Sequence, residues 1–252
     1  MAILWQKTDN HTRYEVRTAG NTRRLYTNGV CHSEYNPGKI LSGSIWDLLM
    51  LPAFFHEPGQ VRRVLVLGVG GGASLLQLYH LVKPEEITGI ELNSIHLYIA
   101  RRFFRAGQTG ITLLEADAVA WLSRYQGEPF DLIIDDLFGE EKRQPARAVK
   151  VDTDWMSLLL RHLTDTGTLV INFVSREELG QSAFFTNTGM APRIRSAFQL
   201  TTPTLDNAVG VFLQKVADSR TLRSRILRNP QLEQGLWSRQ LRYRILQLLP
   251  EE

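Results

Sequence analysis

Apolar runs alternate with helix-like segments through the middle of the chain. Val64–Leu67 is a continuous apolar run, as expected of a strand buried on both faces, and glycines follow it directly. Similar runs occur at 87–91, 111–115, 130–134 and 168–174. Strands that alternate with helices predict a doubly wound α/β domain, with a mostly parallel, twisted sheet and helices on both faces.

The segments between these runs carry apolar residues at helical spacing. We expect helices at about 73–82, 94–105, 118–125 and 155–163, and another within 182–198. Residues 137–152 are mostly polar and predict a surface loop over the strand ends. A late apolar run at 207–214 predicts a strand antiparallel to its neighbour.

The two ends of the chain differ from its middle. Residues 1–38 alternate polar and apolar positions around the strong hairpin signal Asn28-Gly29, which predicts a small N-terminal β meander domain. Residues 39–214 form the predicted Rossmann-like cofactor-binding domain, with a helix before its first strand. Residues 215–252 are rich in arginine and predict a basic tail of two helices packed on that domain.

Composition is that of an ordinary globular protein. The 252 residues are 43% hydrophobic and 22% charged, which is enough for a large core. The apolar runs are too short for a signal peptide or for the roughly 20 residues that cross a bilayer, so we expect a cytoplasmic protein without a membrane partner. The single Cys31 excludes an internal disulfide and a cysteine-built metal site. The net charge of +3 permits an anionic ligand, but the basic tail lacks aromatic stacking platforms, which disfavours nucleic acid.

The glycines after the first buried strand predict a nucleotide-type ligand. Gly68, Gly70 and Gly72 lack the Cβ atoms that would prevent a positive φ, so a ligand can lie against the backbone at the positive end of the next helix. Glu91 ends the following strand, where its carboxylate can accept hydrogen bonds from both ribose hydroxyls. This order of elements predicts an adenosine cofactor. The alternative is a strand–helix–strand unit whose glycines only permit tight packing.

Acidic residues at later strand ends favour an S-adenosyl cofactor over a nicotinamide one. Asp117 follows the third strand, beside Ala118, and can accept a hydrogen bond from the adenine amine; alternatively it caps the next helix. Asp135 and Asp136 follow the fourth strand, where carboxylates would stabilise a positive sulfonium. The alternative for this pair is that only Asp136 faces the cleft.

Seven short motifs spread over most of the chain carry a family resemblance. They are Asn28-Gly29-Val30, Val64–Gly72, Ile90-Glu91, Glu115–Ala118, Phe130–Asp136, Thr202-Pro203-Thr204 and Gly210-Val211-Phe212. Together they resemble the spermidine synthase family of polyamine aminopropyltransferases, in the class I S-adenosylmethionine-dependent methyltransferase superfamily. The resemblance implies a class I methyltransferase fold behind a β-stranded N-terminal domain, a transferase activity and a homodimer. It places ribose binding on Glu91, adenine binding on Asp117 and deprotonation of the amine on Asp136.

Several positions depart from that family's pattern. Gly71 stands where the family has an aspartate for the cofactor's amino group, and Asp136-Leu137-Phe138-Gly139 lacks the family's second diamine-binding acid. His32 replaces a glutamine and Leu205 a tyrosine, and only Asp47 supplies an acid before the first Rossmann strand. His32 and Asp47 are therefore the substrate-side candidates, with a surface histidine as the alternative for His32. A diamine needs carboxylates at both ends, because an unpaired buried ammonium is costly.

These departures lead us to predict S-adenosylmethionine-dependent methyl transfer to a small amine or hydroxyl acceptor, without a metal. The loss of an acid at Gly71 removes a carboxylate that would repel the carboxylate of the whole cofactor. Asp136, with Asp135 beside it, is the predicted proton acceptor or orienting group. The alternatives are aminopropyl transfer from decarboxylated S-adenosylmethionine, as in polyamine synthesis, and a non-catalytic binding protein. Asp117 and the late strand disfavour a nicotinamide-dependent enzyme.

Overall fold

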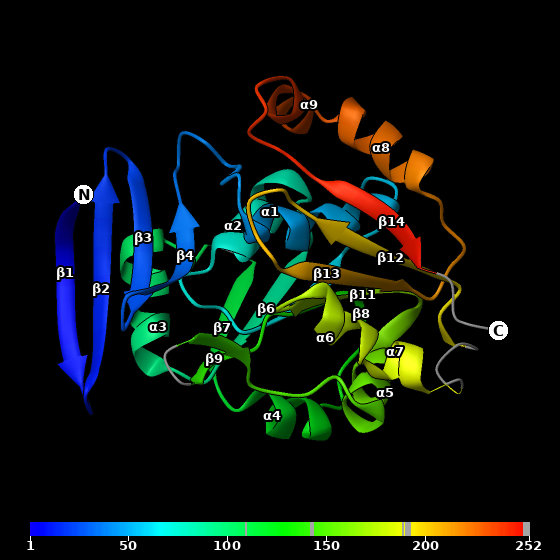
Figure 1. The fold of residues 1–252 in the computed structure, drawn as a ribbon, viewed down its shortest axis with the longest axis horizontal. Coiled ribbons are helices and arrows are strands. Elements are labelled where there is room, and N and C mark those ends of the chain that lie inside the picture. Colours follow the sequence, from blue (N-terminus) through cyan, green and yellow to red (C-terminus); the bar gives the residue numbers. More distant parts are fainter. Residues whose placement is uncertain (109, 142–143, 188, 190–192, 249–252) are drawn as a thin grey trace.

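Two separate sheets organise the protein. The structure is a computed structural model that describes residues 1–108, 110–141, 144–187, 189 and 193–248. The described residues form a four-stranded sheet at the N-terminus, an eight-stranded sheet and a two-stranded hairpin. Figure 1 shows the N-terminal sheet standing at one end of the molecule, with helices packed on the large sheet. The predicted α/β fold behind a small N-terminal β domain is confirmed.

The N-terminal sheet is an antiparallel meander in sequence order. Its strands are β1 (Ala2–Asp9), β2 (Thr12–Ala19), β3 (Thr22–Thr27) and β4 (Val30–Tyr35). The turn between β3 and β4 has positive φ at Asn28 and Gly29, as a two-residue hairpin turn requires. Val16 and Leu25 are fully buried and join the core beneath this sheet. The predicted hairpin therefore brings β4 against the rest of the chain.

The large sheet has the order β14-β12-β13-β11-β8-β5-β6-β7. Its parallel strands are β5 (Arg63–Leu67), β6 (Glu86–Glu91), β7 (Ile111–Glu115), β8 (Phe130–Asp135) and β11 (Leu163–Phe173). Its antiparallel strands are β12 (Ser196–Thr201), β13 (Ala208–Leu213) and β14 (Arg244–Leu248). The chain order reverses between β5 and β8. Ligands of open α/β sheets bind at the carboxyl ends of the strands at such a point.

Helices cover both faces of the large sheet. The helical elements are α1 (Ile45–Met50), η1 (Leu51–Phe55), α2 (Ala73–Leu81), α3 (Ser94–Ile99), η2 (Ala100–Phe104), α4 (Ala118–Arg124), α5 (Thr153–Arg161), α6 (Arg176–Gly180), α7 (Ala183–Thr186), α8 (Ser219–Arg228) and α9 (Pro230–Trp237). Val64 and Val66 of β5 join one core cluster, whereas Leu65 and Leu67 join the other. Successive side chains of a strand point to opposite faces, which explains the continuous apolar run.

Two predicted segments are different in the structure. The loop predicted over residues 137–152 contains the hairpin of β9 (Phe138–Glu141) and β10 (Gln144–Arg147), while 142–143 lie outside the described residues. The helix predicted within 182–198 is only α7, and β12 already begins at Ser196. Residues 188 and 190–192 of that segment are also outside the described part. β12 forms by pairing with both β13 and β14, and local propensity does not reveal such pairing.

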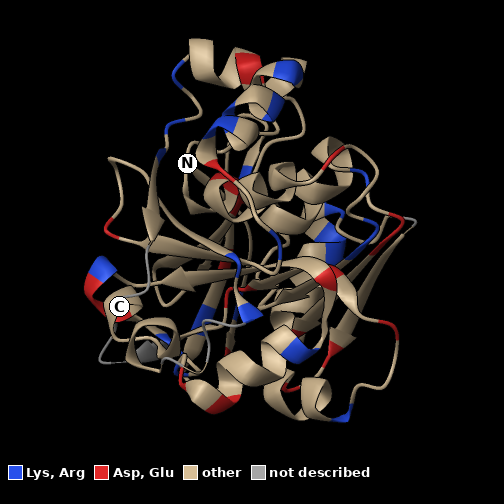
Figure 2. Cartoon of the chain, turned by 90° about the vertical axis from the view of Figure 1, so that its right-hand side faces the viewer, with Lys and Arg blue, Asp and Glu red and all other residues tan. Residues whose placement is uncertain are grey.

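The basic tail is not wholly helical, so that prediction was wrong for its last part. Residues 244–248 form β14, which pairs antiparallel with β12 and makes the edge of the large sheet; residues 249–252 are not described. The helices α8 and α9 lie at the top of Figure 2, where the ribbon is blue at Lys and Arg positions. Leu222 and Ile226 of α8 are fully buried against the sheet's core cluster. Arg220, Arg223 and Arg228 are exposed on the outer side of this amphipathic helix, whereas Arg225 donates to the backbone oxygen of Phe55 in η1.

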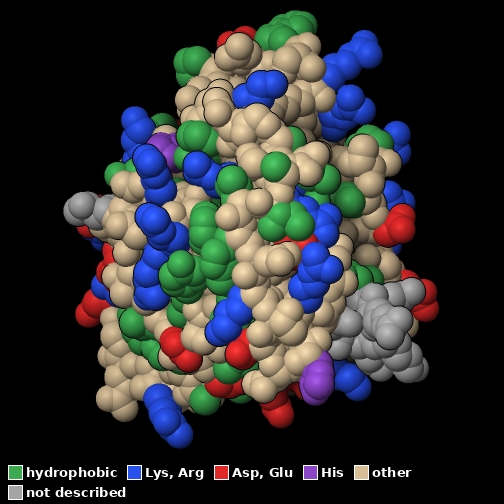
Figure 3. Space-filling model, turned by 90° about the vertical axis from the view of Figure 1, so that its left-hand side faces the viewer, with side chains coloured by type: hydrophobic (Ala, Val, Ile, Leu, Met, Phe, Trp, Pro, Cys, Tyr) green, Lys and Arg blue, Asp and Glu red, His purple; other side chains and the backbone are tan. Residues whose placement is uncertain are grey.

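The outer face of the N-terminal sheet combines apolar and basic side chains. Figure 3 shows hydrophobic side chains next to Lys and Arg on this face, and the edge strand β1 exposes Ile3 and Leu4. The homodimer implied by the family resemblance stays a prediction.

Within the described ranges, no helix has the length and apolar character needed to span a membrane. The same residues contain no cluster of three His, Cys, Asp or Glu side chains suited to a metal ion.

Candidate active site

The glycine turn after β5 lies at the point where the strand order reverses. Gly68, Gly70 and Gly72 all have positive φ, between +53° and +87°. A Cβ on Gly68 would lie 2.2 Å from the backbone oxygen of Asp136, so β5 and β8 approach each other closely here. The turn therefore requires glycine for its backbone conformation and for the approach of the next strand.

Replacing Gly68 by Ala should destabilise the fold by about 2–4 kcal/mol, because a left-handed conformation and a backbone clash act together. Gly20→Ala is the matched control: its φ is +58°, but no atom lies within 4 Å of the added Cβ. This control should lose only about 1–2 kcal/mol. Urea unfolding of both variants measures the difference, and equal losses would contradict the close approach of Asp136.

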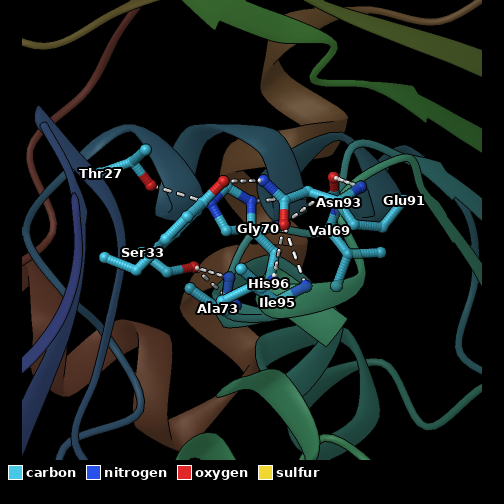
Figure 4. A network of polar contacts seen from close by, with 11 residues as sticks. Thr27, Ser33, Val69, Gly70, Ala73, Glu91, Asn93, Ile95 and His96 are labelled. Carbon is cyan, nitrogen blue, oxygen red and sulfur yellow. Dashed lines mark hydrogen bonds and ion pairs between the residues drawn. The ribbon is translucent and has the colours of Figure 1, made fainter. Parts of the chain in front are cut away.

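Glu91 at the end of β6 holds the glycine turn. Its Oε2 accepts hydrogen bonds from Val69 N at 3.0 Å and Gly70 N at 2.9 Å, and its Oε1 accepts one from Asn93 N at 2.9 Å (Figure 4). Burial would raise the pKa of Glu91, but His96, 3.8 Å away, and the backbone donors outweigh it and lower the pKa. The carboxylate therefore stays ionised at the end of the strand.

Strand β4 covers the same turn from the other side. Ser33 Oγ accepts a hydrogen bond from Gly71 N at 3.0 Å and lies 3.4 Å from Ala73 N (Figure 4). A Cβ on Gly71 would lie 2.7 Å from Ser33 Cβ and 2.9 Å from the ring of Phe104. The position beside Gly71, where the family has an aspartate, is thus closed by the protein's own side chains.

The two substrate-side candidates have different surroundings. His32 is half-buried, and its ring lies 5.3 Å from that of His96, so it packs inward from β4. Asp47 is buried and accepts hydrogen bonds from the backbone of Ser42 and Gly43 and from Gln77. Asp47 therefore holds the start of α1 against α2, and its substrate-side role stays a prediction.

Asp117 is the N-cap of α4, as the alternative interpretation expects. One carboxylate oxygen accepts a hydrogen bond from Ala120 N at 2.7 Å, and the side chain is exposed. Ala118 is buried beside it. The backbone of Ala116 donates to Glu91 O at 3.1 Å, so this loop adjoins the end of β6. Capping leaves the second oxygen of Asp117 available to a ligand at this edge of the sheet.

The acids after β8 point to opposite sides of the sheet. Asp135 is fully buried and accepts hydrogen bonds from Arg147 Nη2 at 2.7 Å and Trp155 Nε1 at 2.8 Å. Asp136 turns the other way, and its Oδ1 accepts a hydrogen bond from Asn172 Nδ2 at 2.8 Å. The alternation of side chains along an extended chain separates the two roles. Asp135 is thus tied into the core, whereas Asp136 is only half-buried at the end of the strand.

Asp136 has an environment suited to proton transfer. Burial raises its pKa to about 7; the hydrogen bond from Asn172 and the charge of Arg147 oppose this shift, while the charges of Asp135 and Glu91 add to it. A carboxyl group with a pKa near the working pH is effective in general acid–base catalysis. Asn172 was missed because it stands inside an apolar run, where a lone amide is the only signal.

The comparisons with known proteins point to one family. A polyamine aminopropyltransferase 2 of Caldanaerobacter subterraneus subsp. tengcongensis is 30% identical over 181 residues, which cover 68% of this chain and 55% of that protein. A polyamine aminopropyltransferase 2 of Ralstonia nicotianae is 30% identical over 137 residues, or 51% of this chain and 26% of that protein. The chain is a relative of the polyamine aminopropyltransferases. It spans little more than half the length of the first relative, and no family model matches it.

Solved structures show the same fold. A probable spermidine synthase from Corynebacterium glutamicum has a TM-score of 0.71 at 16% identity. The match covers 91% of the present chain and 89% of the spermidine synthase chain. A spermidine synthase in complex with the transition-state analogue AdoDATO has a TM-score of 0.66 at 12% identity, with 90% and 78% covered. Human methyltransferase-like protein 13 in complex with SAH has a TM-score of 0.60 at 18% identity, with 77% and 92% covered. The spermidine synthase-like fold is confirmed.

The sequence relatives are transferases by name, in line with the predicted enzyme class. They are aminopropyltransferases, so the comparisons favour the alternative interpretation over the methyl transfer that we predicted first. The likeness to a methyltransferase concerns the fold alone. Two of these structural neighbours are complexes, one with AdoDATO and one with SAH.

Proposed function

We propose that the protein transfers an aminopropyl group from decarboxylated S-adenosylmethionine to an amine acceptor. The observation that carries this proposal is the position of Asp136 at the strand ends, with one oxygen held by Asn172 and a pKa raised to about 7. An alkylammonium has a pKa of about 10 and must lose its proton before its nitrogen can attack carbon. A carboxylate with a raised pKa is a suitable acceptor for that proton.

The chain's own residues divide the work between cofactor and acceptor. When bound, the cofactor supplies a carbon activated by sulfonium, and the new C–N bond forms as the C–S bond breaks. Glu91 is the ribose acceptor and Asp117 the adenine acceptor, since both stand at neighbouring strand ends with acidic oxygens. Asp136 binds the acceptor's ammonium, takes its proton and orients the nitrogen. The ionised Glu91 and Asp136 together favour a cationic ligand.

Ser33 supports the decarboxylated cofactor over the whole one. Amides at the start of a helix are where a carboxylate binds most favourably. At α2 these are the amides of Gly71 and Ala73, and Ser33 Oγ lies 3.0 Å and 3.4 Å from them. Ser33 and Phe104 also fill the space beside Gly71. A cofactor without a carboxylate needs neither these donors nor that space.

Ser33→Gly should therefore shift the preference toward the whole cofactor. Freeing the amides of Gly71 and Ala73 should raise the affinity for S-adenosylmethionine, relative to the decarboxylated form, by about 10-fold. Cys31→Gly is the control, because Cys31 is exposed on the same strand. Calorimetry with both cofactors measures the ratio of the two dissociation constants. A ratio that stays at the parent value in Ser33→Gly would refute this role of Ser33.

The function itself is tested by product analysis. The protein is incubated with decarboxylated S-adenosylmethionine and a panel of mono-, di- and triamines, and methylthioadenosine is followed by mass spectrometry. Acceptor-dependent release of methylthioadenosine, together with an amine extended by one aminopropyl group, is the expected result. Absence of both products with every amine, in a protein that binds the cofactor, would favour a non-catalytic binding protein.

A further inference from the structure

Two asparagines from different elements support Asp136. Asn172, near the end of β11, donates from Nδ2 to Asp136 Oδ1 at 2.8 Å. Asn207, directly before β13, donates from its Nδ2 to Asn172 Oδ1 at 3.1 Å. Asn172 is buried, with 3% of its surface exposed, and Asn207 is half-buried. The three side chains form a chain of hydrogen bonds that runs from the β12–β13 loop to the acid.

The chemistry of the amide gives this series of hydrogen bonds a direction. An ionised Asp136 can only accept hydrogen bonds, so the amide nitrogen of Asn172 must face it. The amide oxygen then faces Asn207, which can donate to it. If Asn172 turned over, its oxygen would face the carboxylate and its nitrogen would face the donor of Asn207, and both contacts would be unfavourable. The carboxylate of Asp136 therefore sets the orientation of Asn172, and the hydrogen bond from Asn207 holds the amide in that orientation.

The second carboxylate oxygen of Asp136, Oδ2, is the one that a ligand can contact. Its Oδ2 makes no hydrogen bond with the part of the chain that the structure describes, and it is not fully enclosed. The backbone oxygen of Asn172 also accepts a hydrogen bond from Arg147 Nη1 at 2.6 Å, which keeps the end of β11 in place. With Oδ1 held by Asn172, the carboxylate presents Oδ2 in one direction.

We propose that Asn207 is a positioning residue that acts through Asn172 to hold the carboxylate of Asp136 with Oδ2 toward the acceptor amine. This inference rests on the proposed function. Its structural part, the hold of Asn172 and Asn207 on the carboxylate of Asp136, can be measured without an acceptor amine. Residues 203–206 of the same loop are exposed, so Asn207 is the point at which this loop is joined to the site. Loss of its donor leaves Asn172 free to turn away from Asp136.

The test compares Asn207→Ala with Asn207→Ser, which keeps a shorter donor, and with Leu205→Ala as a control in the same loop. The hydrogen bond from Asn172 lowers the pKa of Asp136, so weakening it in Asn207→Ala should raise that pKa by about 1 unit. The titration is followed by ¹³C NMR of labelled aspartate carboxyls, with Asp136→Asn to assign the signal. Asn207→Ser should restore part of the shift, and Leu205→Ala should show none.

The kinetic arm uses the amine that gives methylthioadenosine. In Asn207→Ala the acid limb of the pH profile should move to higher pH by the same amount. The fold decrease in kcat should exceed the fold change in KM. A variant that is less stable but titrates as the parent does would overturn the inference. If no amine is turned over while the titration of Asp136 shifts, the proposed function fails and the positioning role holds. If an amine is turned over while the titration stays unshifted, the proposed function holds and the positioning role fails.

Discussion

Replacing Asp136 by Asn should lower kcat for aminopropyl transfer by about 10²–10⁴-fold, the usual contribution of a general base. The amide has the size of the carboxylate, but it cannot take a proton from an ammonium. In the parent protein, activity should rise with pH through about 7, because burial raises the pKa of Asp136 to that value and only its ionised form accepts a proton. Initial rates between pH 5 and 9 measure both effects.

The fold of this variant should stay intact. A carboxyl whose pKa is raised in the folded state binds protons more readily there than in the unfolded chain, so its contribution to stability falls as pH rises from about 4 to 7. Asp136→Asn removes this loss and should unfold no earlier than the parent at neutral pH. A variant that keeps its activity, or one whose activity loss follows from unfolding, would contradict the catalytic role.

Asp135→Asn should have the opposite profile, with a loss of about 3–5 kcal/mol of unfolding free energy. Asp135 is fully buried, and the side chain of Arg147 that it pairs with is only 2% exposed. A neutral Asn leaves this buried guanidinium without its ion-pair partner, although Trp155 Nε1 can still donate to the Asn oxygen. Guanidinium chloride unfolding of the parent and the variant measures the difference.

Two comparisons make this prediction specific. Trp155→Phe removes one hydrogen bond to Asp135 but leaves the ion pair, and it should cost clearly less than Asp135→Asn. Turnover per folded molecule should fall far less in Asp135→Asn than in Asp136→Asn. Equal kinetic losses in the two aspartate variants would mean that both acids act on the substrate.

The order of strands and helices follows from the sequence because burial on both faces leaves a clear mark. The apolar runs at 87–91 and 130–134 place Glu91 and Asp136 at strand ends, and the structure has both strands there. The separate directions of Asp135 and Asp136 could also be anticipated from the alternation of side chains. β14 could not, since its residues form a strand only through pairing with β12.

The contacts within the site depend on packing between distant segments. Ser33 meets Gly71 across 38 residues, Asn172 meets Asp136 across 36 and Asn207 meets Asn172 across 35. No local pattern marks these pairs. Gly71 illustrates the consequence: the sequence shows that an acid is missing there, but it does not show that Ser33 and Phe104 lie beside this glycine in the folded chain.

The most direct measurement gives the protein an equimolar mixture of S-adenosylmethionine and its decarboxylated form, with an accepted amine, and identifies the nucleoside product by mass spectrometry. Aminopropyl transfer predicts methylthioadenosine as the main product, at a rate that falls by at least about 100-fold in Asp136→Asn. S-adenosylhomocysteine together with a methylated acceptor would contradict it and restore methyl transfer as the activity.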